Sequence, residues 1–60
     1  MNIIIRINTD NAAFEDDAAG EVCRILAHLI RSVITEPEPD TMIGLYDLNG
    51  NRVGSYEVTT

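Results

Sequence analysis

The sequence contains no lysine and one cysteine, and its apolar residues form no long run. A single cysteine excludes an internal disulfide. One cysteine and one histidine are also too few for the Cys/His ligand set of a structural zinc site. The run Ile3-Ile4-Ile5 is far too short to span a bilayer, and no charged segment followed by a long apolar stretch marks a signal peptide. We therefore expect a protein that stays in the cytoplasm of the cell that makes it and binds no membrane.

The chain is also short for an independent fold. Its 60 residues make one domain, residues 1–60, and a chain of this size buries only about 60% of its unfolded surface. Small domains without disulfides or metals often gain the missing burial by forming oligomers. We therefore expect a homodimer.

Positive charge is scarce. Ten Asp and Glu residues stand against four Arg, which gives a net charge of −6. Such a surface repels phosphate backbones and anionic lipids, so we expect no direct nucleic-acid binding. A charged partner of this protein should instead be basic.

Residues 20–35 are predicted to form an amphipathic helix. The apolar side chains cover about half of its circumference, wider than the ~100° stripe that a surface helix needs, so one thin sheet is not expected to cover them all. This apolar arc consists of Val22, Cys23, Ile25, Leu26, Leu29, Ile30, Val33 and Ile34. We expect Cys23 to be a buried, reduced thiol.

Both ends of this helix carry sequence signals. Asp16 or Asp17 can cap the N-terminus by accepting hydrogen bonds from free backbone amides. Two starts remain open: one helix from about residue 17, or a short turn at residues 11–14 followed by the main helix. At the other end, the two prolines within residues 36–40 stop the helix and form a stiff, extended connection.

Residues 2–8 are predicted to form a strand, because isoleucine alternates with other side chains and suits a half-buried pleated surface. Phe14, the only phenylalanine, is predicted to plug one end of the core between strand and helix. Ile4 points to the opposite face of the strand. The side chains expected to face the helix are Ile3, Ile5 and Ile7.

Residues 41–48 and 51–59 are predicted strands joined by Asn49-Gly50, the strongest short-range hairpin signal. A three-residue loop ending in Gly50 would shift the pairing by one residue and split the apolar set of one face, so we prefer a two-residue loop. That set is Ile43, Leu45, Tyr56 and Val58. The preferred register pairs Asp47 with Arg52, Leu45 with Gly54, and Ile43 with Tyr56.

These elements predict an α+β domain in the order β-α-β-β, with a three-stranded sheet and one amphipathic helix packed on one face. The first strand can pair parallel to the second or antiparallel to the third. The sequence leaves both strand orders open.

The sequence offers little for catalysis. His28, the only histidine, has Arg24 and Arg31 one turn away and no nucleophile beside it, so we expect a solvated residue rather than a general base. No glycine pattern fits a phosphate loop, and the acidic residues before the helix lack the spacing of an EF-hand. We expect no enzymatic activity, no cofactor and no metal.

Acidic residues gather in two places. The first acidic cluster precedes the helix and has a structural role in capping, whereas carboxylates after a helix C-terminus are mildly unfavourable and need another explanation. Either the second cluster only solvates a connection, or both clusters flank a docking face for a basic partner and stand in for phosphates. The acids at the start of the helix are Asp10, Glu15, Asp16, Asp17 and Glu21, and those just past its end are Glu36, Glu38 and Asp40. As partner-binding residues we take Glu15, Asp16 and Asp17, the first acidic cluster, and Glu36, Glu38 and Asp40, the second acidic cluster.

The sheet face opposite the helix is too apolar in the predicted register to be left fully in water. We take it as a candidate dimer surface. Its members are Ile4, Met42, Tyr46 and Val53.

Three segments carry a resemblance. They are Ile-Arg-Ile-Asn-Thr-Asp-Asn-Ala-Ala-Phe at 5–14, Gly-Glu-Val-x-Arg-Ile-Leu at 20–26, and Asp-Leu-Asn-Gly-Asn-Arg-Val-Gly at 47–54. Together they resemble short uncharacterised proteins encoded by phages, prophages and other mobile elements of Gram-negative bacteria. The resemblance brings no site or activity with it. It implies expression in a bacterial cytoplasm, where small acidic phage proteins often inhibit host defence or nucleic-acid enzymes, as anti-CRISPR proteins do.

Two functions follow from these observations. The first is a non-enzymatic protein-binding module, a phage or mobile-element inhibitor or modulator of a basic, nucleic-acid-binding host protein. The alternative is a homodimeric structural or accessory protein that acts through its apolar outer sheet face, with acidity serving only solubility.

Overall fold

The computed structural model describes residues 1–33 and 36–60, with the backbone alone at 32 and 33. The chain forms the predicted α+β domain in the order β-α-β-β. Its elements are β1 (Asn2–Ile7), a short 3-10 helix η1 (Ala12–Phe14), α1 (Ala18–His28), a π-helical turn η2 (Leu29–Val33), β2 (Met42–Tyr46) and β3 (Arg52–Thr59).

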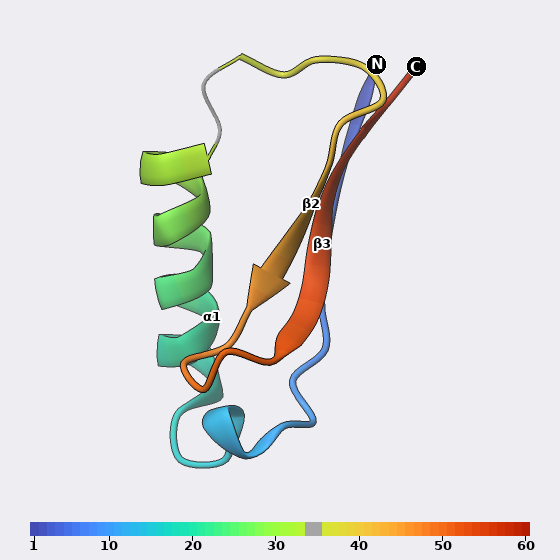
Figure 1. Ribbon diagram of the computed structural model, residues 1–60. Coiled ribbons are helices and arrows are strands. Elements are labelled where there is room, and N and C mark those ends of the chain that lie inside the picture. Colours follow the sequence, from blue (N-terminus) through green and yellow to red (C-terminus); the bar gives the residue numbers. More distant parts are fainter. Residues whose placement is uncertain (34–35) are drawn as a thin grey trace.

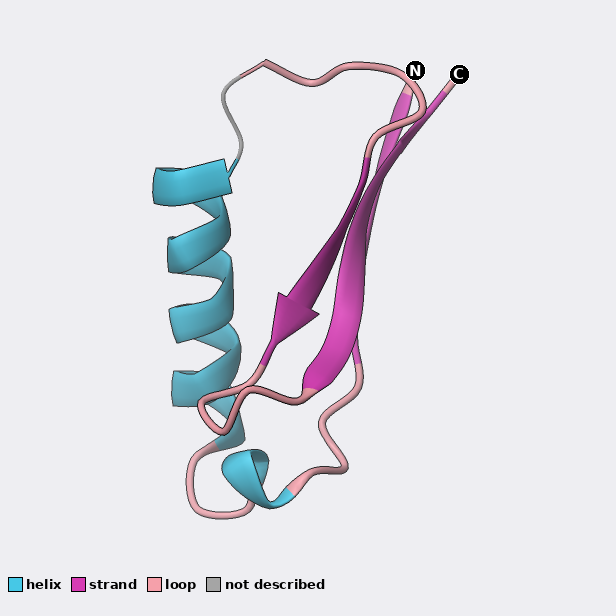
Figure 2. Ribbon diagram, in the orientation of Figure 1, coloured by secondary structure: helices cyan, strands magenta, loops and turns pink. Residues whose placement is uncertain are grey.

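The sheet has the strand order β1-β3-β2, with both pairs antiparallel. β3 is therefore the central strand, and β1 pairs antiparallel with it, which decides between the two orders that the sequence left open. The helix lies along one face of this sheet (Figures 1 and 2). In the β1–β3 register, Ile3 pairs with Val58 and Ile5 with Tyr56.

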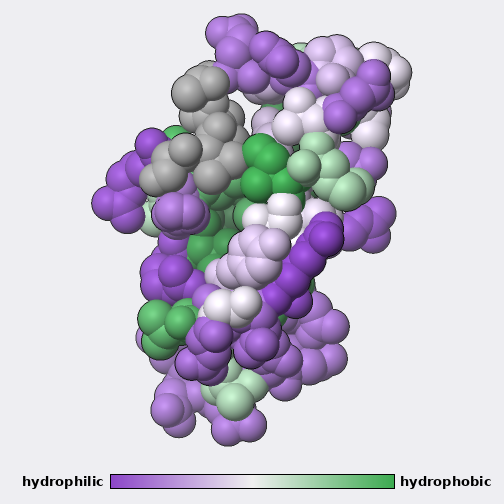
Figure 3. Space-filling model, viewed as in Figure 1, coloured by the Kyte–Doolittle hydropathy of each residue, from purple (hydrophilic) through white to green (hydrophobic). Residues whose placement is uncertain are grey.

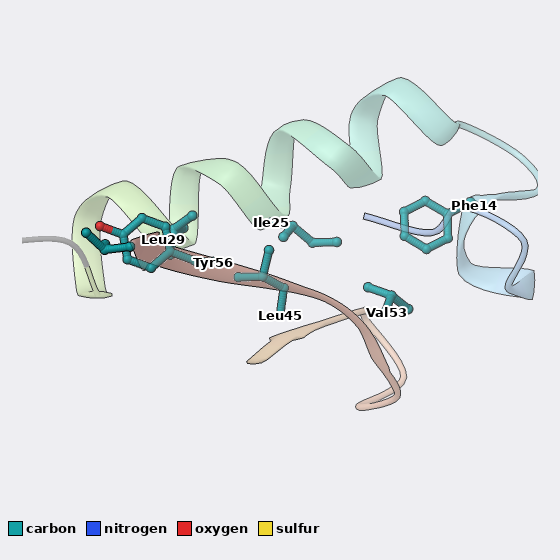
Figure 4. Packing of buried hydrophobic residues seen from close by; sticks show 7 residues of the cluster. Phe14, Ile25, Leu29, Leu45, Val53 and Tyr56 are labelled. Carbon is teal, nitrogen blue, oxygen red and sulfur yellow. The ribbon is translucent and has the colours of Figure 1, made fainter. Parts of the chain in front are cut away.

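The core lies between the helix and the sheet. Hydrophobic atoms show between these two layers, and the surface around them is mainly hydrophilic (Figure 3). Phe14 is 3% exposed and closes one end of the core, as predicted (Figure 4). The predicted inner face of the hairpin is confirmed as well, although Ile43 is only half-buried. The buried apolar residues are Phe14, Ile25, Leu29, Leu45, Val53, Tyr56 and Val58.

The hairpin between β2 and β3 differs from the prediction at its tip. The Asp47 N–H donates to the Asn51 carbonyl (2.9 Å) and the Gly50 N–H donates to the Asp47 carbonyl (3.0 Å), so the loop has three residues, 48–50. Gly50 has φ 84°, a left-handed conformation that glycine adopts without steric cost. The predicted two-residue loop and the Asp47–Arg52 pair are therefore wrong.

A β-bulge in β3 then restores the predicted register. Tyr46 pairs with Arg52, but the next pair is Leu45 with Gly54, so Val53 is the extra residue. The bulge turns Val53 to the helix side of the sheet, where it is 7% exposed and belongs to the core (Figure 4). The prediction that Val53 lies on the outer face is therefore wrong.

The helix begins earlier than Gly20. Asp17 is its N-cap, and the side-chain Oδ1 accepts a hydrogen bond of 2.9 Å from the Gly20 N–H. The structure contains both the short turn, as η1, and a helix that starts directly after residue 17. The predicted end of the helix at residues 34–35 lies outside the described residues, as do the side chains predicted for the apolar arc at 33 and 34.

Candidate binding surfaces

The two acidic clusters lie at opposite ends of the molecule. The first acidic cluster is in the loop between η1 and α1, and the second is in the connection from the helix to β2 (Figure 1). The molecule measures 36 × 19 × 17 Å, and the clusters occupy the two ends of its long axis. All six carboxylate-bearing residues are exposed. The fold therefore presents two separate acidic ends and does not bring the clusters together.

The backbone of the second acidic cluster is held against the sheet. The Asp40 N–H donates to the Val58 carbonyl (3.0 Å), and the Thr41 hydroxyl donates to the Glu38 carbonyl (2.7 Å). Asp40 has φ 66°, a left-handed conformation that Asp tolerates better than most residues do. These contacts fix the end of the acidic connection beside the first residues of β2.

Most of the acidic charge is not neutralised within the fold. Among residues 1–33 and 36–60, the one ion pair joins Arg24 to Glu21. Glu21, which the sequence groups with the acids at the start of the helix, is therefore neutralised, whereas no member of the two acidic clusters takes part in this ion pair. Asp17 has a structural role as N-cap, whereas the other five carboxylates are directed to solvent without an ion-pair partner in the described part of the chain.

Glu21 and Arg24 bind the hairpin tip to the helix. Glu21 is only 8% exposed, and its carboxylate accepts two hydrogen bonds from Arg24, Nε at 2.7 Å and Nη2 at 2.9 Å. Arg24 Nη2 also donates to the carbonyl of Tyr46 (3.2 Å). The hydrogen bonds from Arg24 lower the pKa of Glu21 although burial opposes the shift, and the same pair raises the pKa of Arg24. Glu21 is thus a structural residue.

Asp47 is a second buried carboxylate, 5% exposed. Its Oδ1 accepts from the backbone N–H groups of Asn49 and Asn51, both at 2.9 Å, and its Oδ2 accepts from Asn11 Nδ2 at 3.0 Å. Burial acts to raise the pKa of Asp47, but the hydrogen bonds from Asn51, Asn11 and Asn49 outweigh it and lower the pKa. Asp47 therefore organises the hairpin loop and ties it to the segment before η1.

A groove of about 190 Å³ separates α1 from the edge strand β2. This volume is below the 300–1,000 Å³ of sites that hold drug-sized ligands. His28 is exposed and borders the groove, as predicted for a solvated residue. Its lining residues are Arg24, Ile25, His28, Gly44, Leu45, Tyr46 and Asp47.

The described residues contain no group of three or more His, Cys, Asp or Glu side chains arranged to hold a metal ion. A second hollow of about 270 Å³ is polar, and the acidic side chain on it, Asp10, is accompanied by Arg52. The other residues around this hollow are Asn8, Asn11 and Val53.

The predicted dimer surface on the outer sheet face is not continuous. With Val53 in the core, its remaining members are Ile4, which is half-buried, and Met42 and Tyr46, which are 60% and 54% exposed. Glu57 stands between Ile4 and Met42 in the register. Farther along the face, the side chains of Tyr46 and Arg52 converge over Gly44, so this surface mixes apolar and charged groups.

A different apolar surface is uncovered on the helix side of the sheet. Ile3 and Ile5 face this side, as predicted, because they pair with the buried Val58 and Tyr56, yet they are 48% and 43% exposed. On the helix, Ile30 is 66% exposed and Cys23 is exposed too. The prediction of a buried Cys23 is therefore wrong, and the expectation that one sheet would not cover the whole apolar arc is confirmed.

This surface, which we call the β1 flank and define by the exposed Ile3, Ile5 and Ile30 together with the half-buried Leu26, was not predicted as a binding site. The sequence places all four in the core by residue type. The available signal was the width of the apolar arc, but locating the uncovered part requires the strand order, which the sequence left open.

Comparison with known proteins gives no relative for this chain. No family model matches the sequence, and no curated protein or solved structure matches it either. None of the described helices is both long and apolar enough to cross a membrane.

Proposed function

We propose that this protein is a small, non-enzymatic binding module that docks its two acidic ends on a basic surface of a partner protein. The observation that carries the proposal is the unneutralised charge: all six residues of the two clusters are exposed, and the one ion pair of the described residues uses other side chains. A module of this kind gains association rate and specificity from complementary charge.

Two arginines, Arg24 and Arg31, lie between the two acidic ends, and positive charge there weakens the attraction to a basic surface. Arg31 is exposed, and its Nε donates to the Ala27 carbonyl at 3.3 Å. Arg24, however, is neutralised by two hydrogen bonds from its side chain to the buried carboxylate of Glu21. The acidic ends are farther apart than the Debye length of about 8 Å at physiological salt, so each end acts as a separate contact.

The partner we propose is a nucleic-acid-binding protein of a bacterial host, whose phosphate-binding sites would accept the carboxylates. The resemblance to phage and prophage proteins supports this choice, and an inhibitor or modulator of a host protein is the role that it favours. In such a complex, nucleic acid and this protein compete for the same basic residues. Displacement by nucleic acid can therefore be measured before the partner is identified.

The test compares capture of proteins from a nuclease-treated bacterial lysate by three forms of the immobilised chain. The second-cluster variant is E36Q/E38Q, the first-cluster variant is E15Q/D16N, and the wild type is the reference. Each variant changes the net charge by two. Both leave Asp17, which caps the helix, and Asp40, which has a left-handed backbone conformation, unchanged. A matched control with the same charge change elsewhere is D10N/E57Q.

We expect a basic protein that the wild type and the control capture, that duplex DNA or raised salt releases, and that at least one cluster variant captures several-fold less. Capture that is unchanged in both cluster variants, or that DNA does not displace, overturns the proposal. In that case the alternative of a homodimeric accessory protein, with acidity serving only solubility, takes its place.

A further inference from the structure

Among residues 1–33 and 36–60, no segment pairs with the outer edge of β1. The Asn8 N–H donates to the Val53 carbonyl (2.8 Å), so the backbone of Asn8 is directed toward β3. Hydrogen-bonding direction alternates along an antiparallel strand, so Arg6 and Ile4 are also directed toward β3. The N–H and C=O groups of Ile3, Ile5 and Ile7 are therefore directed to the open edge of the sheet.

Apart from the exposed Arg6, β1 lacks the features that usually keep an edge strand from pairing with another chain. It has no proline, no glycine, no bulge and no inward-pointing charge. The opposite edge, β2, contains Gly44, and the Tyr46 carbonyl is already bonded to Arg24 Nη2 at 3.2 Å. The two edges therefore differ, and β1 is the one suited to accept another strand.

The β1 flank lies directly beside this open edge. Arg24 and His28 line the groove on the β2 side of the helix. Leu26 and Ile30, each two residues farther along, lie about 200° around the helix and so on the β1 side. With respect to the described residues, an added strand would thus find both unpaired backbone groups and a partly exposed apolar surface.

The sequence of β1 and the next residue is self-complementary. Residues 2–8 read Asn-Ile-Ile-Ile-Arg-Ile-Asn, and the pattern is symmetric in character about Ile5 except at Ile4 and Arg6. If two copies pair antiparallel at Ile5, Ile3 lies opposite the partner's Ile7 and Asn2 lies opposite the partner's Asn8. Arg6 then lies opposite the partner's Ile4, so no like charges face each other across the pair.

Charge also permits a second copy at this edge. Each chain carries a net charge of −6, but its first nine residues contain no Asp or Glu. Two copies that meet along β1 therefore approach through a part of the chain without acidic residues, and Asp40 and Asp47, which flank β2, lie toward the opposite edge of each sheet.

We propose that the protein forms a two-fold symmetric dimer in which the β1 strands of two copies pair antiparallel about Ile5. The product is a continuous sheet of six strands with both helices on the same face. The two β1 flanks then meet over the joined strands. A stable interface must bury more than about 1,000 Å², and the contact between the two flanks adds apolar area to that of the strand pair. This dimer does not depend on the proposed function.

The wild-type protein provides the first test. Light scattering after size-exclusion chromatography should give about 13 kDa, twice the chain mass of 6.6 kDa. Amide hydrogen exchange followed by NMR should show Ile3, Ile5 and Ile7 exchanging at least about tenfold more slowly than exposed amides. The amides of Ile4 and Arg6, which are directed toward β3, are the internal reference. A monomer, or a dimer in which the three odd-numbered amides exchange freely, overturns the proposal.

A pair of variants tests the edge itself. Ile5→Lys places a charge at the centre of the proposed interface and leaves the β1–β3 hydrogen bonds in place, so a folded monomer is expected. Met42→Lys makes the same charge change on the opposite edge strand and should remain a dimer. If Met42→Lys dissociates while Ile5→Lys does not, the interface is on the outer face and the proposal fails. If Ile5→Lys does not fold, amide exchange at Ile3, Ile5 and Ile7 of the wild type still shows whether the β1 strands pair.

Discussion

The carboxylate of Glu21, in the first turn of α1, accepts a hydrogen bond of 2.7 Å from the backbone N–H of Leu48 at the tip of the β2–β3 hairpin. The same carboxylate binds Arg24, which in turn reaches the carbonyl of Tyr46. One ion pair thus joins the start of the helix to the end of β2 and to the loop that follows. In a chain with so small a core, this polar contact fixes how the hairpin sits against the helix.

This contact makes the stability depend on pH. The pKa of Glu21 is held below its ordinary value of 4.5 by the hydrogen bonds from Arg24 and Leu48. A carboxylate whose pKa falls on folding stabilises the folded state above its unfolded pKa, and this stabilisation is lost as the pH falls through the folded pKa. We therefore expect Glu21→Gln to lower the thermal unfolding midpoint at pH 7, and the difference from the wild type to shrink at acid pH.

Thermal unfolding followed by circular dichroism from pH 7 to pH 3 measures this difference. Glu15→Gln is the matched control, because Glu15 is exposed and belongs to no ion pair in the described part of the chain. It should leave the midpoint nearly unchanged at neutral pH. A constant gap between Glu21→Gln and the wild type over the whole pH range would contradict the role given to this carboxylate.

The core should tolerate little loss of buried apolar side-chain volume. Leu29 is 1% exposed, and truncation of such a side chain costs about 2–5 kcal/mol. A 60-residue chain has roughly 3–9 kcal/mol of total stability. We therefore expect Leu29→Ala to remove most of the free energy of unfolding measured in urea. Leu48→Ala, at a leucine that is 71% exposed, should change it by less than about 0.5 kcal/mol, and equal effects of the two variants would be inconsistent with the described core.

The hairpin shows why the overall register could be predicted and the local geometry could not. The apolar alternation of β2 and β3 correctly pairs Leu45 with Gly54 and Ile43 with Tyr56. Asn49-Gly50 fits both a two-residue loop and a three-residue loop in which Gly50 is left-handed. The loop shifts the register by one residue and the bulge at Val53 shifts it back, so the two departures cancel beyond Leu45.

The helix shows a similar limit. Hydrophobic periodicity located it, but residue type did not predict which part of its apolar arc the sheet covers. Glu21 is buried because Arg24 and the hairpin backbone satisfy its carboxylate, whereas Cys23 is exposed because it points away from the sheet. Both outcomes depend on contacts between distant segments, and a single helical period contains no information about them.

The candidate surfaces were predictable to different degrees. The exposure of both acidic clusters follows from their composition and from their places outside the predicted helix. The β1 flank was not predicted, because its exposure depends on β3 lying at the centre of the sheet and β1 at its edge.

Gly54 allows β1 to approach β3. A Cβ at this position would overlap the carbonyl oxygen of Arg6, which is backbone and has no rotamer to relieve the contact. We expect Gly54→Ala to lower the free energy of unfolding by about 1–3 kcal/mol or more, as overpacking substitutions do. Amide exchange at Ile4 and Arg6 should become faster.

The control for Gly54 is Gly44→Ala in β2. A Cβ at Gly44 would lie 3.2 Å from the ring of Tyr46 and 3.3 Å from Arg52 Nε, and both of these exposed side chains can move aside. This variant should therefore unfold at nearly the same urea concentration as the wild type. A Gly54→Ala protein as stable as Gly44→Ala would mean that β1 is not packed against β3 as described.

The carboxylate of Asp47 should keep the hairpin loop in one conformation. Asp47→Ala removes the side-chain acceptor of the Asn49 and Asn51 amides, and the buried site leaves those donors without an equivalent partner. We expect a lower thermal midpoint and faster hydrogen exchange at these two amides, with the largest loss of stability above the unfolded pKa, because the pKa of Asp47 is lowered on folding. Asp16→Ala, at an exposed carboxylate, should change neither quantity. Slow exchange at Asn49 and Asn51 in Asp47→Ala would show that the backbone alone holds the loop.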